Sequence, residues 1–156
     1  MYARGRRWQA ESRLNRLGAS VARTRVLIGQ GPPILQAIIR DIVGAARDMK
    51  LAGMAPARHS ADGPAAREWL SMAVARIRPD VVLVGRNEDD SGEYWRRLVA
   101  RHAGMRIVAV EPGGRDVVVF EVGVEPAHIG EASEPVLLSA IRAPRADPGG
   151  LGPSWS

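Results

Sequence analysis

The chain has 156 residues, which is the length of one domain and enough to bury a hydrophobic core. Hydrophobic residues make up 46% and charged residues 25%, as in an ordinary globular protein, and the absence of cysteine excludes disulfides, thiolate catalysis and cysteine-ligated zinc. No apolar run approaches the roughly 18 residues that span a bilayer, and no apolar segment follows the basic N-terminus as in a secretory signal. We therefore expect a cytoplasmic protein without a membrane contact.

The net charge of +5 is concentrated at the N-terminus. Residues 1–25 contain seven arginines and one acid, so they carry +6 and the other 131 residues carry about −1. Within 1–22, apolar residues follow a weak amphipathic-helix spacing at Trp8, Leu14, Leu17 and Val21. This basic arm is predicted either to dock on the domain through Trp8 and Leu14 or to contact an acidic protein partner or RNA. Its candidate partner-binding residues are Arg4, Arg6, Arg7, Trp8, Arg13 and Arg16.

The first half of the domain alternates strands and helices. The predicted elements are a strand at 24–28, a turn at 29–33, a helix at about 34–47, a second strand at 50–54 and a loop at 55–63. The helix after the turn begins with a proline, which suits a first helical position, and its spacing places four apolar residues on one face: Ile34, Ile38, Ile42 and Ala45.

The second half is built around a central strand at 81–85, an apolar run bounded by Pro79 and Gly85 that is typical of a strand buried on both faces. Before it we predict a helix at 64–77, with Ala65, Trp69, Met72 and Val74 or Ile77 inward. After it we predict an acidic loop at 87–92, a helix at about 93–103 with Trp95, Leu98 and Val99 inward, strands at 105–110 and 116–122, a loop at 123–132, and a last helix ending near Arg142 and capped by Ser133.

These elements predict an α/β fold: a three-layer α/β/α sandwich with a mostly parallel sheet in the order 2-1-3-4. Only five residues, 111–115, separate the last two predicted strands, which is too few for a parallel crossover. The fifth strand is therefore expected to be antiparallel, at the C-terminal edge of the sheet. The chain divides into an arm at 1–22, an α/β domain at 23–143 and a Pro/Gly-rich tail at 144–156 that is expected to be disordered.

The order and spacing of several segments resemble the receiver domain of bacterial response regulators, a flavodoxin-like fold. The similarity is closest over residues 25–85 and looser in the last third of the chain. It is carried by Arg25-Val26-Leu27-Ile28 with Pro33-Ile34, by 48–55 with Asp62-Gly63 and Ala65-Ala66, by Arg78-Pro79-Asp80-Val81-Val82-Leu83-Val84, and by the closing helix 133–142.

The positions where that family performs its chemistry differ in this chain. Gln30 and Gly31 replace the acidic pair that holds Mg²⁺, Gly85 replaces the phosphoacceptor aspartate, and Glu111 replaces the hydroxyl residue. The lysine that contacts the phosphoryl group is missing, because Lys50, the one lysine of the chain, lies elsewhere. Phosphorylation needs this carboxylate nucleophile, cation and lysine together. The resemblance therefore implies a degenerate pocket, and the helix that normally precedes the fifth strand is also expected to be deleted.

Other candidate sites have weaker support. Gly29 and Gly31 at a strand-to-helix turn could hold an anion or nucleotide, although a tight turn is the simpler interpretation. The acidic residues Glu88, Asp89, Asp90 and Glu93 could bind a cation, but a solvated loop is favoured. No motif spacing joins the histidines or supports a serine nucleophile: His59, His102, His128, Ser71, Ser91 and Ser133. We expect no catalytic residue, no metal site and no cofactor.

We therefore predict a non-enzymatic pseudo-receiver domain that acts in bacterial signalling by phosphorylation-independent protein–protein interaction. The contact surfaces would be the arginine arm and the outer strand edge of the 107–122 hairpin, and a homodimer is possible. The alternatives are a nucleic-acid-associated regulator that uses the arm and a small-ligand sensor at the 29–33 turn.

Overall fold

The computed structural model describes residues 23–87 and 90–144. The strands are β1 (Thr24–Ile28), β2 (Met49–Met54), β3 (Val81–Gly85), β4 (Arg106–Val110), β5 (Val117–Phe120) and β6 (Ala127–Gly130). The α-helices are α2 (Pro33–Ala45), α3 (Pro64–Ile77), α4 (Glu93–Arg101) and α5 (Glu134–Arg142). Two short 3₁₀ helices, η2 (Ala57–His59) and η3 (Pro112–Gly114), lie in the loops.

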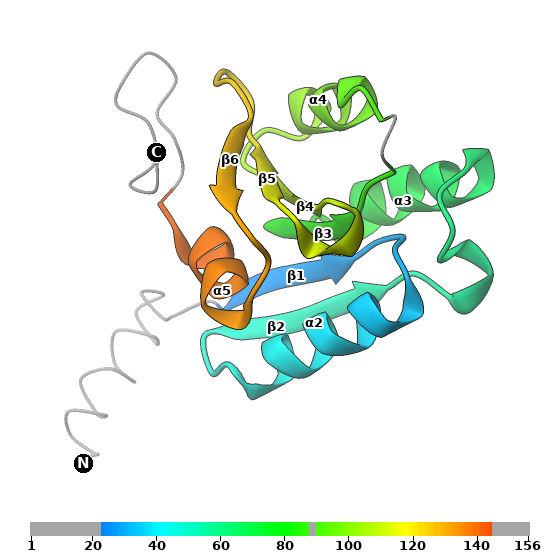
Figure 1. Ribbon diagram of the computed structural model, residues 1–156. Helices are drawn as coiled ribbons and strands as arrows, with labels where there is room; N and C mark the ends of the chain where they lie inside the picture. Colours follow the sequence, from blue (N-terminus) through cyan, green and yellow to red (C-terminus); the bar gives the residue numbers. More distant parts are fainter. Residues whose placement is uncertain (1–22, 88–89, 145–156) are drawn as a thin grey trace, which may run out of the picture.

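The strands form one six-stranded sheet in the order β2-β1-β3-β4-β5-β6. The first four strands are parallel, and β5 is antiparallel to β4, which confirms the predicted hairpin. Helices cover both faces, so the predicted three-layer α/β sandwich with a mostly parallel sheet is confirmed (Figure 1).

The prediction was wrong about the C-terminal edge of the sheet. The segment 123–132, predicted to be a loop, contains β6, which pairs with β5 in antiparallel orientation. β6 is therefore the edge strand, and the outer edge of the 107–122 hairpin is covered by it rather than available for pairing. The strand has only four residues and pairs irregularly, with a register shift between Val117 and Val118, so it lacks the length and clear alternation that identify strands in a sequence.

Two hydrophobic clusters lie on opposite faces of the sheet. One joins the sheet to α2 and α5 through residues that include Ile39, Val43, Leu137 and Ile141. The other joins it to α3 and α4 through residues that include Leu70, Val74, Trp95 and Leu98. The strands alternate between the two clusters, as a buried pleated sheet requires.

The inward faces of two helices differ from the prediction. In α3 the buried residues are Ala66, Leu70, Ala73 and Val74, whereas the predicted Ala65 and Met72 are exposed. In α2 the buried residues are Gln36, Ile39 and Val43, whereas Ile34, Ile38 and Ala45 of the predicted inward face are exposed and Ile42 is partly buried. The Gln36 side chain explains why this face of α2 is turned toward the sheet, because its Nε2 donates a buried hydrogen bond to the Gly29 carbonyl at 2.8 Å. The inward residues of α4, Trp95, Leu98 and Val99, are as predicted.

The last helix, α5, has the boundaries that the sequence predicts. Ser133 caps α5, since its Oγ accepts a hydrogen bond from the Val136 amide at 3.3 Å. No helix within 23–87 and 90–144 has the length and apolar character that a bilayer crossing requires. The predicted arm at 1–22 and nearly all of the predicted tail lie outside the described residues, so the division of the chain stays a prediction.

Candidate functional site

The four predicted pocket positions come together where the parallel strands end. The backbone of Gly85 lies against that of Gly31, and the Gly85 amide donates to the Gln30 carbonyl at 2.8 Å. A Cβ atom added to Gly85 would lie 3.2 Å from both the Gly31 Cα and the Pro32 Cδ. A side chain at residue 85 would therefore pack tightly against backbone and ring atoms, which would have to move by a few tenths of an ångström, and glycine permits this close approach.

The turn at 29–33 does not offer its glycine amides to an anion. The Gly29 amide donates to the Leu83 carbonyl at 2.8 Å, and the Gly31 amide donates to the Ser60 carbonyl at 2.7 Å. Pro32 and Pro33, which begin α2, have no N–H to donate. The two glycine amides are thus already engaged within the fold, and an anion or nucleotide at this turn stays a prediction.

Asp62 accepts hydrogen bonds from three polar side chains beside this edge. Gln30, which is 1% exposed, donates from Nε2 to Asp62 Oδ1 at 2.9 Å. Arg67 donates to both Asp62 oxygens, at 3.0 and 2.8 Å, and Asn87 donates to Oδ2 at 3.1 Å. Burial raises the pKa of the Asp62 carboxyl, but the hydrogen bonds from Arg67 and Gln30 outweigh it, so the pKa lies below its usual value. The carboxylate stays ionised and fixed.

Arg86 forms a second cluster with two acids. Its Nη1 lies 3.0 Å from Glu111 Oε2, and its Nη2 donates to the Asp90 carbonyl at 2.7 Å. The Asp90 carboxylate is 4% exposed and accepts hydrogen bonds from the Gly92 amide at 2.8 Å and from Trp95 Nε1 at 2.5 Å. Asp90 was predicted to lie in a solvated acidic loop, which is wrong, since this carboxylate is buried and organises the start of α4. Glu93 is exposed, and Glu88 and Asp89 lie outside the described residues.

The remaining polar candidates have structural contacts. Ser71 Oγ and the Tyr94 hydroxyl lie 2.9 Å apart, and His128 Nδ1 lies 2.6 Å from Asp116 Oδ2 beside β6. His59 ends η2, and His102 follows α4. Ser91 Oγ accepts a hydrogen bond from the Glu93 amide at 3.3 Å. Among residues 23–87 and 90–144, no three His, Asp or Glu side chains are grouped closely enough to hold a metal ion.

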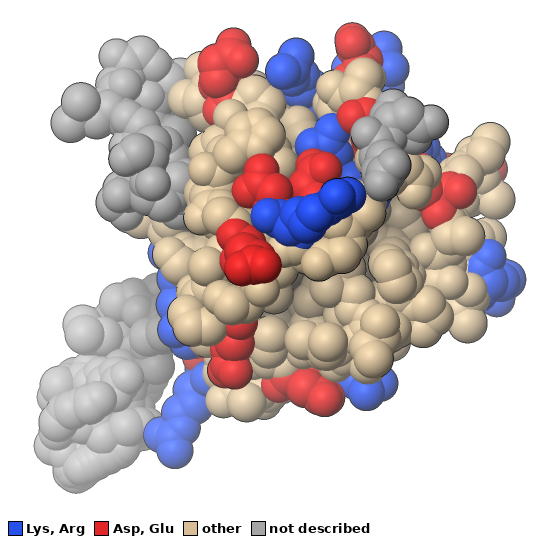
Figure 2. Space-filling model, viewed as in Figure 1, with Lys and Arg blue, Asp and Glu red and all other residues tan. Residues whose placement is uncertain are grey.

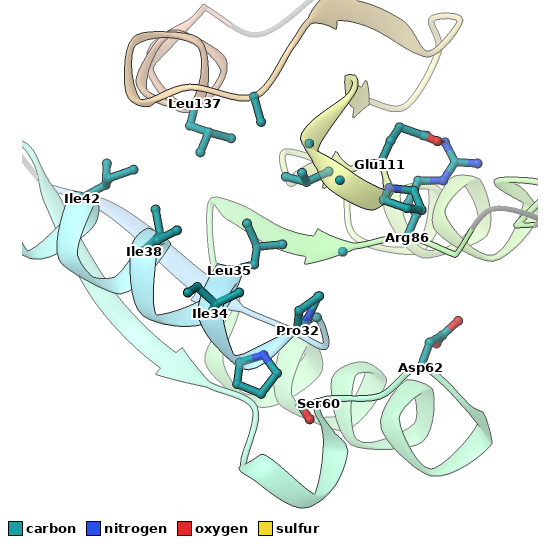
Figure 3. Close-up of a pocket in the computed structure, with 18 of the residues that line it drawn as sticks. Pro32, Ile34, Leu35, Ile38, Ile42, Ser60, Asp62, Arg86, Glu111 and Leu137 are labelled. Carbon is teal, nitrogen blue, oxygen red and sulfur yellow. The ribbon is translucent and has the colours of Figure 1, made fainter.

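A groove of about 1100 Å³ opens at this edge, between α2 and α5. Its apolar lining includes Pro32, Leu35, Ile38, Ile42 and Leu137, and its polar end includes Asp62, Arg86 and Glu111. Figure 3 shows the side chains of Leu35, Ile38 and Ile42 pointing from α2 toward Leu137 of α5, with Arg86 and Glu111 at the other end. In Figure 2 charged side chains gather over this end, and the surface below them is mostly uncharged.

Two isoleucines make this groove unusual. Ile34 is 73% exposed and Ile38 is 48% exposed, although both belong to the apolar face that the sequence predicts for α2. An apolar helix face that lies open beside a cavity is typical of a surface that binds something. The periodicity of α2 was therefore a genuine signal, but it marked the groove and not the packing on the sheet.

The charged lining of the groove is acidic. Four acids and one arginine line it, which gives a formal charge of −3: Asp41, Asp62, Glu111, Glu134 and Arg86. The apolar floor and acidic rim together favour a ligand that is apolar on one side and basic on another. Sequence reasoning missed this rim because its members come from four separate segments that only the fold brings together.

Comparisons with known proteins were made at the level of family models, curated sequences and solved structures. No family model matches the chain, and no curated protein matches it. Among solved structures, the chain is similar to the response regulator domain of Thermotoga maritima CheB, with 20% sequence identity and a TM-score of 0.44. The match covers 58% of this chain and 61% of that chain, which is less than two thirds of its length.

Proposed function

We propose that this chain is a non-catalytic, receiver-like regulatory domain that binds a protein partner in the groove between α2 and α5, without phosphorylation. The exposure of Ile34 and Ile38 beside the groove carries the proposal. A soluble domain keeps such side chains uncovered at a cost in free energy, and a binding surface accounts for them.

The shape of the groove favours a protein segment over a small metabolite. Its volume of about 1100 Å³ lies at the upper limit of the roughly 300–1,000 Å³ that is usual for small-molecule pockets, so the form of its walls decides between the two. The long wall is the helix α2, with a row of aliphatic side chains, and the first turn of α5 faces it with Leu137. An amphipathic helix that lies in such a groove would be recognised through a row of apolar anchors.

The absence of phosphorylation is part of the same proposal. Gly85 provides no nucleophile, and the nearby carboxylates of Asp62 and Asp90 are held by Arg67 and Arg86 in ion pairs. Glycine at residue 85 also permits a close approach of Gly31 and Pro32, so the Cβ atom of an aspartate there would be crowded by both. Gly85→Asp should therefore lower the free energy of unfolding by about 1–3 kcal/mol and should not gain a phosphoryl group from acetyl phosphate and Mg²⁺. Intact-protein mass spectrometry checks the second outcome for both chains, and phosphorylation of the unaltered chain would overturn this part of the proposal.

The partner proposal is tested by capture from a nuclease-treated cell extract with the full chain as bait. Ile38→Asp places a charge in the groove, and the matched control Met72→Asp places one on α3, where Met72 is 60% exposed on the other side of the sheet. The proposal predicts one protein that the unaltered chain and Met72→Asp retain and that Ile38→Asp loses. A partner lost equally by both variants, or kept by both, would show that the groove is not the contact.

The same experiment addresses the alternative of nucleic-acid binding through the arm. Material that disappears on nuclease treatment and is indifferent to Ile38→Asp would favour that alternative, which also requires binding that falls steeply with salt. A cytoplasmic location and a possible homodimer stay predictions beside the proposal.

A further inference from the structure

We propose that residues 1–22 of this chain occupy the groove between α2 and α5 until a partner replaces them. The inference rests on the proposed function, because it identifies a basic amphipathic segment as the chemistry that the groove recognises. It makes the N-terminal arm a competitor of the partner on the same molecule.

Charge is the first support. Residues 1–22 carry five arginines and one acid, a formal charge of +4: Arg4, Arg6, Arg7, Arg13, Arg16 and Glu11. The groove lining carries −3. Opposite charges at these magnitudes attract a tethered segment and fix its orientation, while an acidic segment would be repelled.

The apolar residues of the arm are the second support. Trp8, Leu14, Leu17 and Val21 follow the spacing of one helix face, and the groove presents Leu35, Ile38, Ile42 and Leu137. The C-terminal segment 145–156 complements the groove less well. It contains one arginine and one aspartate, so its formal charge is zero, and its large apolar residues are limited to Leu151 and Trp155.

The place where the chain enters the fold is the third support. The Thr24 amide donates to the Asp48 carbonyl at 2.9 Å, so residues 1–22 are attached close to the C-terminal end of α2. Arg142, at the C-terminal end of α5, also pairs with Asp48, at 2.8 Å. Both helices that border the groove thus end beside the point of attachment. A 13-residue helix such as α2 is about 20 Å long, and 22 residues reach about 33 Å even as a helix, so the arm can run the length of the groove.

The absence of cysteine from the chain permits a direct test by disulfide crosslinking. The full-length double variant Leu14→Cys with Ile38→Cys places one thiol in the arm and one in the groove. The matched control is Leu14→Cys with Met72→Cys, whose second thiol is similarly exposed but lies on the opposite side of the sheet. Both are oxidised at low protein concentration and analysed by non-reducing electrophoresis and intact mass.

The proposal predicts an intramolecular disulfide that forms several-fold faster in the groove variant than in the control. Equal rates in the two variants would overturn it, since a mobile arm meets both thiols alike. Crosslinks found only between chains would overturn it as well, and would assign the groove to a second copy.

A second measurement separates this inference from the proposed function. In a full-length chain with Leu14→Asp and Leu17→Asp, the arm loses its apolar anchors, and a maleimide should label Ile38→Cys several-fold faster than in a chain with an unaltered arm, with Met72→Cys unchanged. Unchanged labelling at Ile38→Cys overturns the arm proposal. The partner found by capture is then tested on the same chain. Groove-dependent retention of that partner with no arm crosslink leaves the proposed function standing alone, whereas an arm crosslink with no partner contact at the groove overturns the proposed function alone.

Discussion

Arg106 joins three elements through one buried side chain. It begins β4 and is 2% exposed, and its guanidinium donates to Glu121 Oε2 after β5 at 2.8 and 3.0 Å. It also donates to the Ala140 carbonyl of α5 at 2.7 Å and to the Pro144 carbonyl at 3.0 Å. A buried guanidinium with this set of acceptors attaches the C-terminal end of α5 to the sheet.

Removal of the acid should therefore be costly. Glu121→Leu deletes the carboxylate that accepts two hydrogen bonds from Arg106, and a buried charge deprived of such a partner destabilises a fold by about 3–5 kcal/mol. We expect a loss of this size in the free energy of unfolding measured by urea denaturation. The control is Glu93→Gln, whose exposed pair with Arg97 at 3.8 Å should contribute no more than about 0.5 kcal/mol. Similar losses in both variants would contradict the role given to Arg106.

Asp62 gives the site a defined response to pH. Its folded-state pKa is lowered, so its contribution to stability is present above the unfolded-state pKa of about 3.9 and is lost as the pH falls through the folded-state value. Asp62→Asn should lower the free energy of unfolding at pH 7 by about 1.5 kcal/mol, a usual value for hydrogen bonds to a charged group.

The difference in the free energy of unfolding between the unaltered chain and Asp62→Asn should become smaller as the pH is lowered through the acid range, because the Asp62 carboxyl of the unaltered chain becomes protonated. Urea titrations at several pH values provide the measurement. Asp41→Asn is the control, since Asp41 is exposed on α2 and its pair with Arg40 spans 3.6 Å. A difference for Asp62→Asn that is constant with pH would show that the lost stability is not electrostatic.

At the scale of the elements, α2 separates two roles in neighbouring residues. Ile39 packs in the core beneath the helix, and Ile38 faces the groove. Ile39→Ala should lower the free energy of unfolding by about 2–5 kcal/mol, whereas Ile38→Ala should change it by less than about 1 kcal/mol, as usual for a position near the surface. Thermal or urea unfolding measures both. A large loss for Ile38→Ala would mean that the groove face is structural.

The elements also show how far the sequence alone can lead. The periods of hydrophobic residues located each predicted helix and five of the six strands, because buried strands and amphipathic helices impose regular patterns. β6 was missed since a four-residue edge strand with a glycine carries no such pattern. The face of α2 was misassigned because a polar residue, Gln36, occupies its buried side and bonds to Gly29.

Some residues of the candidate site could also be identified from the sequence, and others could not. Gln30, Gly31, Gly85 and Glu111 could be identified because the resemblance to receiver domains assigns them to strand ends, which meet at one edge of a parallel sheet. The buried role of Asp90 and the ion pairs of Arg86 could not, because they depend on side-chain directions across two loops and the first turn of α4. The groove was invisible for the same reason, although its two isoleucines were already placed on one helix face.

At the scale of the whole molecule, positive charge is concentrated in the arm and negative charge lines the groove. A synthetic peptide with the sequence of residues 1–22 should therefore bind the chain in trans, more weakly than the attached arm because it must displace it. Replacement of its five arginines by glutamine should reduce the affinity, and so should an increase of the ionic strength from about 0.05 to about 0.5 M. Fluorescence anisotropy of a labelled peptide provides the measurement.

Two controls make the peptide experiment specific to the groove. Ile38→Asp should weaken peptide binding, and Met72→Asp should leave it unchanged. Binding that is equal for all three chains, or that is insensitive to the peptide's arginines, would contradict the charge complementarity described here.

The buried guanidinium of Arg106 has a consequence for the kinetics of binding. Because α5 cannot leave the sheet without stripping Arg106 of its acceptors, the groove does not need to open before a ligand enters, and its walls are already in place. When the arm has lost its apolar anchors through Leu14→Asp and Leu17→Asp, association should then follow a rate proportional to ligand concentration, in the usual range of about 10⁵–10⁷ M⁻¹s⁻¹ for docking onto a rigid surface. In the unaltered chain the rate should instead reach a plateau at high ligand concentration, because the departure of residues 1–22 from the fixed groove is a first-order step.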